Sequence, residues 1–191
     1  GVDYVFHQAA MASVPRSIRE PALCHAWCAT STVELLHAAS EAGVKRLVLA
    51  STSAAYGDSP FVSKRESDAV APLSPYAAAK LAAEAYCRAF VTSFSMEAVI
   101  LRYFNVFGPR QDPNGPYAAV IPIFIDRSLK NESVYIDGDG LQTRDFTFVA
   151  NAVQANIRSL FTEDKDAFGK VYNIAYGERF SILSMYETIC E

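Results

Sequence analysis

Arg46-Leu-Val-Leu-Ala-Ser-Thr-Ser53 is the stretch that decides the fold, because an apolar run of strand length passes directly into hydroxylated side chains. Helical patterns flank this stretch, one from about Ala22 to Ala42 and one from about Pro75 to Phe94. Gly43 follows the first pattern as a C-cap, and Ser74 precedes the second as an N-cap. A short apolar strand between two capped helices predicts an α/β protein.

Further runs of strand length alternate with these helical patterns. The order strand-helix-strand-helix-strand predicts a doubly wound parallel sheet with helices on both faces. Ligands of such sheets lie at the carboxyl ends of the strands, so we expect functional residues within 7–13, 51–57 and 103–115. The additional predicted strands are Val2 to Phe6, Ala98 to Arg102 and Val171 to Ile174.

After Gly115 the α/β rhythm loosens. We expect a helix near Ala118 to Lys130, a short strand from Ser133 to Ile136, and a helix from about Val149 to Phe161. Residues 1–115 are predicted to form the C-terminal part of the sheet domain, and residues 116–191 a mixture of return segments and part of a smaller substrate-binding lobe. The chain begins on a strand without Met and stops within a helical pattern, so we expect it to be truncated at both ends.

The composition favours a globular protein with a small-molecule site. Apolar residues make up 51% of the chain, and the net charge of −4 is spread without like-charge runs. This argues against nucleic acid or a membrane as partner. Cys24 and Cys28 share a helix face while Cys87 and Cys190 stand alone, so we expect reduced thiols of a cytoplasmic protein and no metal site.

Tyr76-Ala-Ala-Ala-Lys80 lies at the start of the second helical pattern, and its two polar residues stack on one helix face. A phenol with a pKa of ~10 is a poor base at neutral pH unless a cation stabilises the phenolate. Lys80 can supply that charge. A lone motif of this spacing arises often by chance, however, and a surface pair is the plainer interpretation.

Ser51-Thr-Ser53 changes the balance between these interpretations. Hydroxyl groups at the carboxyl end of a strand can hydrogen-bond a substrate hydroxyl beside a phenolate, although such runs are usually polar turns. A strand that ends in hydroxyl groups, followed after about 20 residues by Tyr-x-x-x-Lys on the next helix, is far less accidental. The combination favours a functional site over a surface pair.

With these motifs the sequence resembles the extended short-chain dehydrogenase/reductase family, in its NAD-dependent epimerase/dehydratase branch. The resemblance implies a Rossmann-type fold with a small substrate-binding lobe, NAD as cofactor, and a role in nucleotide-sugar metabolism such as polysaccharide biosynthesis. It also implies a homodimer through the helix carrying Tyr76 and Lys80, with packing by Leu81, Ala82, Ala85 and Ala89. The matching stretches are His7-Gln-Ala-Ala10, Ser51-Thr-Ser53 with Tyr56-Gly57, Pro75-Tyr-Ala-Ala-Ala-Lys80, Leu101-Arg-Tyr-Phe-Asn-Val-Phe-Gly-Pro109, and Gly138-Asp-Gly140 with Arg144-Asp-Phe146.

The residues after Thr52 narrow the implied reaction. Family dehydratases carry an acidic pair there, and decarboxylating members a Glu, whereas this sequence has Ser53 and Ala54. The resemblance therefore implies a 4-epimerase working through a 4-keto intermediate. The stretches Asp112 to Gly115 and Pro116 to Pro122 look like enzymes that interconvert UDP-N-acetylglucosamine and UDP-N-acetylgalactosamine, although Asp-Pro-Asn-Gly is also an ordinary turn.

Other functions remain open at this point. One is another UDP-hexose or UDP-uronate epimerase of the same family. Another is a non-catalytic NAD-binding protein, or an inactive fragment. The chain carries Thr52, Tyr76 and Lys80 together, which speaks against a mere sensor, since a sensor needs no proton chemistry.

The resemblance also implies roles for individual residues. Tyr76 is the expected base and Thr52 the group that orients the sugar 4-hydroxyl. The expected catalytic residues are Thr52, Tyr76 and Lys80; the expected NAD contacts are Ala9, Ala10, Tyr76, Lys80 and Phe104; and the expected substrate contacts are Ser13, Thr52, Ser53, Asn105, Ala119, Val120, Tyr135 and Arg144.

Some of these residues have plainer interpretations. Tyr135 is also typical of a core aromatic, and Arg144 could pair with Asp139 or Asp145. His7 ends a predicted buried strand, where a hydrogen-bonded core histidine is more common than a catalytic acid.

The sequence departs from the family pattern in two respects. Relatives place an Asn where Cys28 stands, which puts one hydrogen bond in doubt. The glycine-rich phosphate loop of the family is absent, so we expect the chain as given to be inactive and to bind NAD poorly or not at all.

Overall fold

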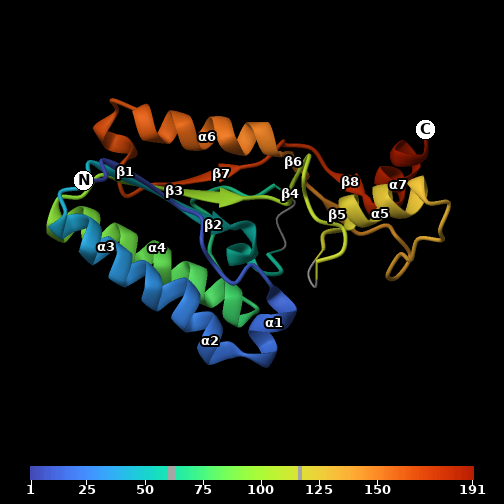
Figure 1. Ribbon diagram of the computed structural model, residues 1–191, viewed down its shortest axis with the longest axis horizontal. Helices are drawn as coiled ribbons and strands as arrows, with labels where there is room; N and C mark the ends of the chain where they lie inside the picture. The colour runs from blue at the N-terminus through green and yellow to red at the C-terminus, as the bar shows by residue number, and fades with distance from the viewer. Residues whose placement is uncertain (60–62, 116–117) are drawn as a thin grey trace. The chain divides into compact units, whose positions relative to one another are not determined.

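The computed structural model describes residues 1–59, 63–115 and 118–191. The chain forms two compact units (Figure 1). The first unit contains Gly1–Tyr103 and Val153–Ile174, and the second contains Phe104–Ala152 and Ala175–Glu191. The division expected at residue 115 thus falls inside the second unit, because the chain leaves the sheet at the end of its third strand.

A parallel sheet forms the centre of the first unit, as predicted. Its strand order is β1-β2-β3-β7, and every neighbouring pair is parallel. The last strand comes from the return segment and pairs with β3 over Ile100↔Val171 to Tyr103↔Ile174. The strands are β1 (Tyr4–His7), β2 (Arg46–Thr52), β3 (Ala98–Tyr103) and β7 (Val171–Ile174).

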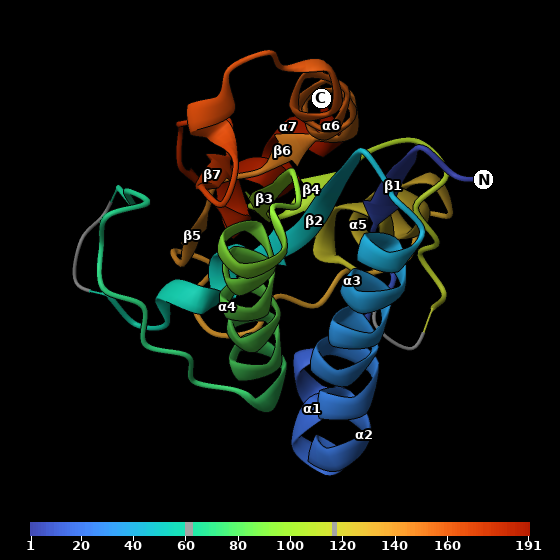
Figure 2. The same ribbon diagram turned by 90° about the vertical axis from the view of Figure 1, so that its left-hand side faces the viewer.

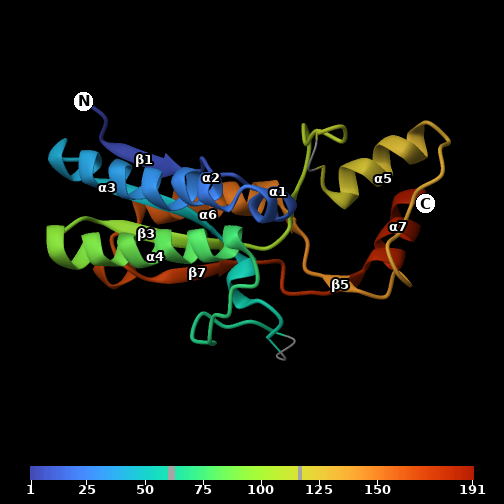
Figure 3. The same cartoon turned by 90° about the horizontal axis from the view of Figure 1, so that it is seen from below.

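Helices cover both faces of this sheet. α3 (Ser31–Glu41) and α4 (Pro75–Phe94) run side by side over one face, and α6 (Val149–Phe161) covers the other (Figures 1, 2 and 3). Leu36, Leu49 and Ile100 are fully buried between the sheet and α3 and α4. Val48, Val99 and Leu160 form the core under α6. Successive side chains of each strand therefore point to opposite faces of the sheet, and on both faces they pack against apolar helix residues.

The helical pattern predicted from Ala22 to Ala42 is divided in the structure. α2 (Pro21–His25) passes through a π-helical turn, η1 (Ala26–Thr30), into α3. Hydroxyl groups of the following turn satisfy carbonyls there, because Ser31 Oγ donates to the Trp27 carbonyl and Thr32 Oγ1 to the Cys28 carbonyl, both at 2.7 Å. A preceding helix that the pattern did not predict is α1 (Val14–Arg19).

The caps follow the sequence more closely. Ser74 Oγ accepts a hydrogen bond from the Ala77 amide, so α4 begins where the sequence predicts. Gly43 has a φ of 67° directly after α3, as a C-cap requires.

The second unit packs two helices over a small apolar core. Ile121 and Phe124 of α5 (Val120–Leu129) meet Ile182 and Met185 of α7 (Ile182–Cys190). The strand predicted from Ser133 to Ile136 is wrong, because that segment has no ladder partner among the described residues. Two short ladders are present instead: β4 (Val106–Phe107) pairs with β6 (Thr147–Phe148), and β5 (Thr143–Arg144) pairs with β8 (Phe180–Ser181).

Two short 3₁₀ turns lie in the first unit, η2 (Ser53–Tyr56) and η3 (Lys165–Ala167).

Arg46 closes the end of α6 and gives a test of the fold. Its Nη1 donates to the carbonyls of Ser159, Leu160 and Thr162 at the C-terminus of that helix, where carbonyls lack helical partners. Because these bonds carry charge, we expect Arg46→Met to lower the free energy of unfolding of the full-length protein by about 2–4 kcal/mol. Urea denaturation measures this difference.

A matched control is Lys45→Met, which breaks the exposed 2.9 Å pair between Lys45 and Asp3. An exposed ion pair contributes about 0–1 kcal/mol. Equal losses from the two substitutions would contradict the role of Arg46 in closing α6.

Candidate active site

Thr52 and Tyr76 meet in the first unit at the carboxyl end of β2. Pro75 occupies the first helical position of α4 and thereby places Tyr76 in its first turn. The Thr52 side chain is hydrogen-bonded to the Tyr76 phenol and also accepts a hydrogen bond from the Ala54 amide at 3.1 Å. Lys80 lies one turn further along α4 and is only 2% exposed. The expected catalytic residues thus lie on β2 and on one face of α4.

The surroundings of this group shift its titration. Burial raises the pKa of Tyr76, and the hydrogen bond with Thr52 only partly opposes this. Burial lowers the pKa of Lys80, and the interactions of Lys80 with Cys28 and Glu84 oppose this effect. In the chain by itself, Tyr76 is therefore protonated at neutral pH. Proton transfer to Tyr76 needs a positive charge held close to its oxygen.

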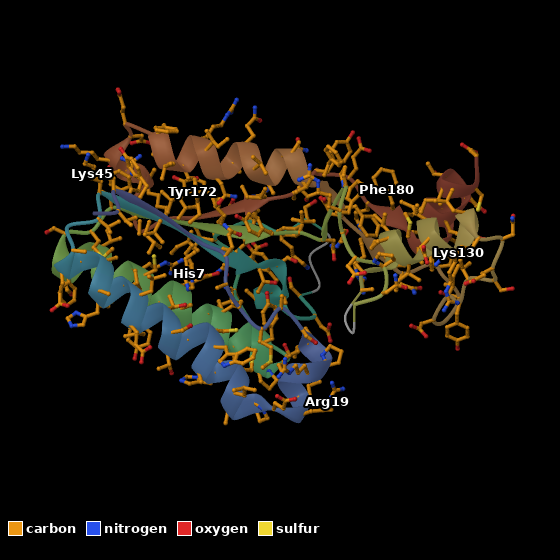
Figure 4. The ribbon with its side chains drawn as sticks, viewed as in Figure 1. His7, Arg19, Lys45, Lys130, Tyr172 and Phe180 are labelled. Carbon is orange, nitrogen blue, oxygen red and sulfur yellow. The ribbon has the colours of Figure 1, made fainter. Side chains whose placement is uncertain are left out.

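His7 is a hydrogen-bonded core residue, in agreement with the plainer interpretation. Its Nε2 lies 2.8 Å from Thr32 Oγ1 of α3, and the ring is buried on the side of the sheet that faces α3 and α4 (Figure 4). Cys28 lies nearby, and its Sγ accepts a hydrogen bond from the Met11 amide at 3.3 Å. The sulfur of Cys28 thus makes an internal hydrogen bond in the structure.

The buried histidine predicts a pH dependence of stability. Burial and then the charge of Lys80 lower the pKa of His7 from 6.5 to about 4. Between these two pH values His7 binds a proton in the unfolded chain but not in the folded chain. The free energy of unfolding therefore decreases as pH falls from 6.5 to about 4. We expect His7→Gln to flatten this part of the curve of melting temperature against pH, and an unchanged slope would contradict the assignment.

The other expected contacts in the first unit have defined local roles. Ser13 is buried as the N-cap of α1, where its Oγ accepts a hydrogen bond from the Arg16 amide. Ser53 begins η2 directly after Thr52. Ala9 is exposed and Ala10 half-buried just beyond the end of β1. The contacts of these residues with ligands stay predictions.

A pocket of about 360 Å³ lies within the second unit, and it collects the predicted substrate contacts of that unit. The chain approaches it from β4 and the residue before it, from the start of α5, and from the segments on either side of Gly138. Phe104, an expected NAD contact, is the first residue of this unit and is half-buried. The predicted residues that line the pocket are Asn105, Ala119, Val120, Tyr135 and Arg144.

Tyr135 and Arg144 are available to a ligand of this pocket. Tyr135 is 78% exposed, so its interpretation as a core aromatic is wrong. Asp145 accepts the amides of Tyr176 and Gly177 at 2.8 Å. Within the described residues no carboxylate lies within ion-pair distance of Arg144, so its guanidinium is available to an anion.

Two further pocket residues were not identified from the sequence. Gln142 Nε2 donates to the carbonyl of Asp137 at 2.8 Å, and both residues line the pocket. Gln142 lies between Gly140 and Arg144, within the stretch that the sequence singled out, so its position was the available signal. Asn105 Nδ2 donates to the Asp145 carbonyl at 2.7 Å, which fixes the loop after β3 to the strand segment of Arg144.

Asp112 shows the local turn chemistry expected of Asp-Pro-Asn-Gly. Its Oδ1 accepts a hydrogen bond from the Asn114 amide at 2.8 Å, as in an Asx turn. Pro116 and Tyr117, which belong to the following predicted stretch, lie outside the described residues.

In the described ranges, no group of three or more His, Cys, Asp or Glu side chains could hold a metal ion. None of the helices in the same ranges has the length and apolar character needed to cross a bilayer.

Comparison with known proteins gives consistent matches along the chain. Residues 1–175 match the model of the NAD dependent epimerase/dehydratase family. The chain is 36% identical over 189 residues to a putative UDP-glucose 4-epimerase of Methanocaldococcus jannaschii, covering 98% of this chain and 60% of that protein.

Solved structures agree with the sequence match. The UDP-N-acetylglucosamine 4-epimerase from Methanobrevibacter ruminantium, in complex with UDP-N-acetylmuramic acid, has a TM-score of 0.92 and 44% identity over 97% of this chain and 58% of that one. The Thermus thermophilus UDP-glucose 4-epimerase in complex with NAD has a TM-score of 0.88 and 36% identity, over 98% and 61%. The chain spans about three fifths of the length of these relatives.

Proposed function

The chain belongs to the NAD dependent epimerase/dehydratase family, and we propose that the full-length protein is a nucleotide-sugar 4-epimerase. The observation that carries the proposal is the hydrogen bond between Thr52 and Tyr76, with Lys80 buried one turn further along α4. This group can move one proton at an alcohol oxygen. Ser53 and Ala54, next to it, offer no carboxyl group for expelling water, which favours epimerisation over dehydration.

The proposed mechanism assigns one task to each side chain. Thr52 holds the sugar 4-hydroxyl beside Tyr76, and the Tyr76 phenolate takes its proton as the 4-keto sugar forms. Lys80 stabilises that phenolate. NAD, when bound, supplies the hydride acceptor and donor for the sugar C4. Tyr76 returns the proton when the 4-keto sugar is reduced on its other face, so the cofactor is unchanged after each cycle.

The described residues fit one part of NAD. Ala9 and Ala10 follow β1 with small side chains, which leave room at the carboxyl end of the sheet for a flat ring. Among the described residues no carboxylate forms an ion pair with the Lys80 ammonium, so its donors remain available for ribose hydroxyls. The sequence contains no Gly-x-Gly-x-x-Gly loop, so the proposal assigns no residue of this chain to the pyrophosphate.

The pocket of the second unit supports a nucleoside diphosphate sugar as substrate. We assign Arg144 to a phosphate, Tyr135 to the face of the base, and the main chain of Ala119 and Val120 to the nucleotide. Asn105 is assigned to the diphosphate. UDP-N-acetylglucosamine and its galacto isomer are the proposed pair, with Ser13 and Ser53 next to the hexose and its N-acetyl group.

Product analysis of the full-length protein tests the substrate. We expect the protein to equilibrate UDP-N-acetylglucosamine with UDP-N-acetylgalactosamine and to turn over UDP-glucose more slowly. Chromatography of the products measures both reactions. Turnover of UDP-glucuronate alone would show the uronate alternative to be right. Binding of NAD without turnover of any of these sugars would instead support a non-catalytic NAD-binding protein.

We further propose a homodimer through α4. Ala85 and Ala89 are exposed on this helix, and the rings of Tyr86 and Phe94 are about half exposed. Leu81 and Ala82 are half-buried in the same helix. An apolar helix face of this kind is typical of an interface. Light scattering of the full-length protein should give twice the monomer mass, and a monomer would contradict the dimer.

A cytoplasmic location stays a prediction.

A further inference from the structure

Glu84 is a buried carboxylate on the catalytic helix that the proposed mechanism does not use. It lies one turn after Lys80 and two turns after Tyr76 on α4, and it is only 2% exposed. Its carboxylate accepts hydrogen bonds from Arg102 Nε at 2.9 Å and Nη2 at 2.7 Å, and from the Ser51 hydroxyl. Ser51 and Arg102 are register partners on β2 and β3, so Glu84 joins α4 to two strands at once.

The contacts of Arg102 extend this network within the first unit. The guanidinium lies over the ring of Tyr56, 4.8 Å from its centroid, and the Tyr56 hydroxyl donates to Asn173 Oδ1 of β7 at 2.7 Å. Buried ion pairs are seldom a better source of stability than apolar packing of the same volume. A buried carboxylate placed one turn from the proposed catalytic lysine therefore calls for a functional account.

The groups that face Lys80 come from four elements. On α4 these are Tyr76 and Glu84. From α2 and η1 they are Cys24 and Cys28, and burial raises the pKa of the Cys24 thiol to about 11, so it is uncharged at neutral pH. From β1 it is His7, whose pKa of about 4 also makes it neutral. Glu84 is the carboxylate among them.

We propose that Glu84 is a positioning residue for the epimerase reaction, which keeps Lys80 in its ammonium form and holds α4 against the end of β2 beside Thr52. This inference rests on the proposed function. Burial lowers the pKa of Lys80, and the interactions with Cys28 and then with Glu84 oppose this loss. Arg102 and Ser51 hold the Glu84 carboxylate in place through three hydrogen bonds, two of them from a guanidinium.

Two substitutions in the full-length enzyme test the proposal. Glu84→Gln keeps the shape and removes the charge, while Glu84→Asp keeps the charge but withdraws it by one methylene. We expect the alkaline limb of kcat/KM against pH to move down by about one unit in Glu84→Gln, and by less in Glu84→Asp. Assays at low temperature with saturating NAD keep a destabilised variant folded.

A second readout is independent of turnover. Nuclear magnetic resonance of isotope-labelled lysine side chains in the NAD-free protein follows the titration of the Lys80 Nζ, which is assigned by its loss in Lys80→Met. The Lys80 titration should fall by about one unit in Glu84→Gln and by a smaller amount in Glu84→Asp. An unchanged Lys80 titration in both variants would overturn the proposal.

Glu97→Gln is the matched control. Glu97 also accepts two hydrogen bonds from an arginine, Arg46 Nε at 3.0 Å and Nη2 at 2.6 Å, but at the amino end of β3. It should lower stability without moving the alkaline limb. Equal shifts from Glu84→Gln and Glu97→Gln would reduce Glu84 to a structural role. A failure of the epimerase proposal itself would show differently, as turnover retained in Tyr76→Phe. The Lys80 titrations do not use that variant, so the two failures can be distinguished.

Discussion

Tyr76→Phe in the full-length protein is expected to lower kcat by about 10²–10⁴-fold while leaving UDP-sugar affinity nearly unchanged. The substitution removes only the phenolic oxygen, which is hydrogen-bonded to Thr52 in the structure. The ring stays and packs against the cluster around Met11 and Ala79. The loss should therefore fall on proton transfer rather than on folding or binding. Steady-state kinetics give kcat, and calorimetry with UDP gives the affinity.

Tyr4→Phe is the matched control for this substitution. Tyr4 lies on β1, is exposed, and belongs to no proposed contact with substrate or cofactor. It should keep the activity of the parent enzyme. A Tyr76→Phe enzyme that retained near-parental kcat would exclude Tyr76 as the base and with it the proposed mechanism.

Arg102→Met is expected to lower the free energy of unfolding by about 3–5 kcal/mol, a large part of the stability of a domain. The substitution leaves the Glu84 carboxylate buried without its cation, since Arg102 provides two of its hydrogen bonds. Urea denaturation of the full-length protein measures the loss. The double variant with Glu84→Gln should lose less than the sum of the single variants, because the two residues interact directly.

Lys130→Met provides the comparison at the surface. Lys130 and Asp126 form an exposed pair at 2.8 Å on α5, one helical turn apart. This pair should contribute no more than about 1 kcal/mol. A similar loss for Arg102→Met and Lys130→Met, or strict additivity with Glu84→Gln, would contradict the account of the buried pair.

Local signals in the sequence were sufficient where a cap or an apolar run defines an element by itself. The helix from Pro75 to Phe94 and the strand from Val171 to Ile174 have the predicted bounds. Where tertiary pairing decides, the sequence was insufficient. The π-helical turn at Ala26–Thr30 depends on hydroxyl groups of the next turn, and the segment Ser133 to Ile136 has strand composition without a neighbouring strand in the described part of the chain.

The candidate site divides in the same way. Tyr76 and Thr52 were identified by short motifs, and the structure joins them by a hydrogen bond, while their catalytic roles stay predictions. The network around Glu84 was not predicted, because Ser51 and Arg102 come from separate strands and become neighbours only through sheet register. From the sequence, Ser13 is a polar residue that follows a predicted strand. In the structure it is the N-cap of a helix that the pattern did not predict, and its side chain accepts a hydrogen bond from the Arg16 amide.

The return of the chain into the first unit has a consequence for biosynthesis. β3 ends at Tyr103, but its outer neighbour β7 begins only at Val171, after the whole of Phe104–Ala152 has been synthesised. During translation the amide and carbonyl groups on that edge of β3 have no strand partner until the intervening segment has emerged from the ribosome. An open, apolar strand edge is a template for pairing with other chains. The nascent chain therefore exposes an edge of β3 that can pair with other chains between the emergence of residue 103 and that of residue 174.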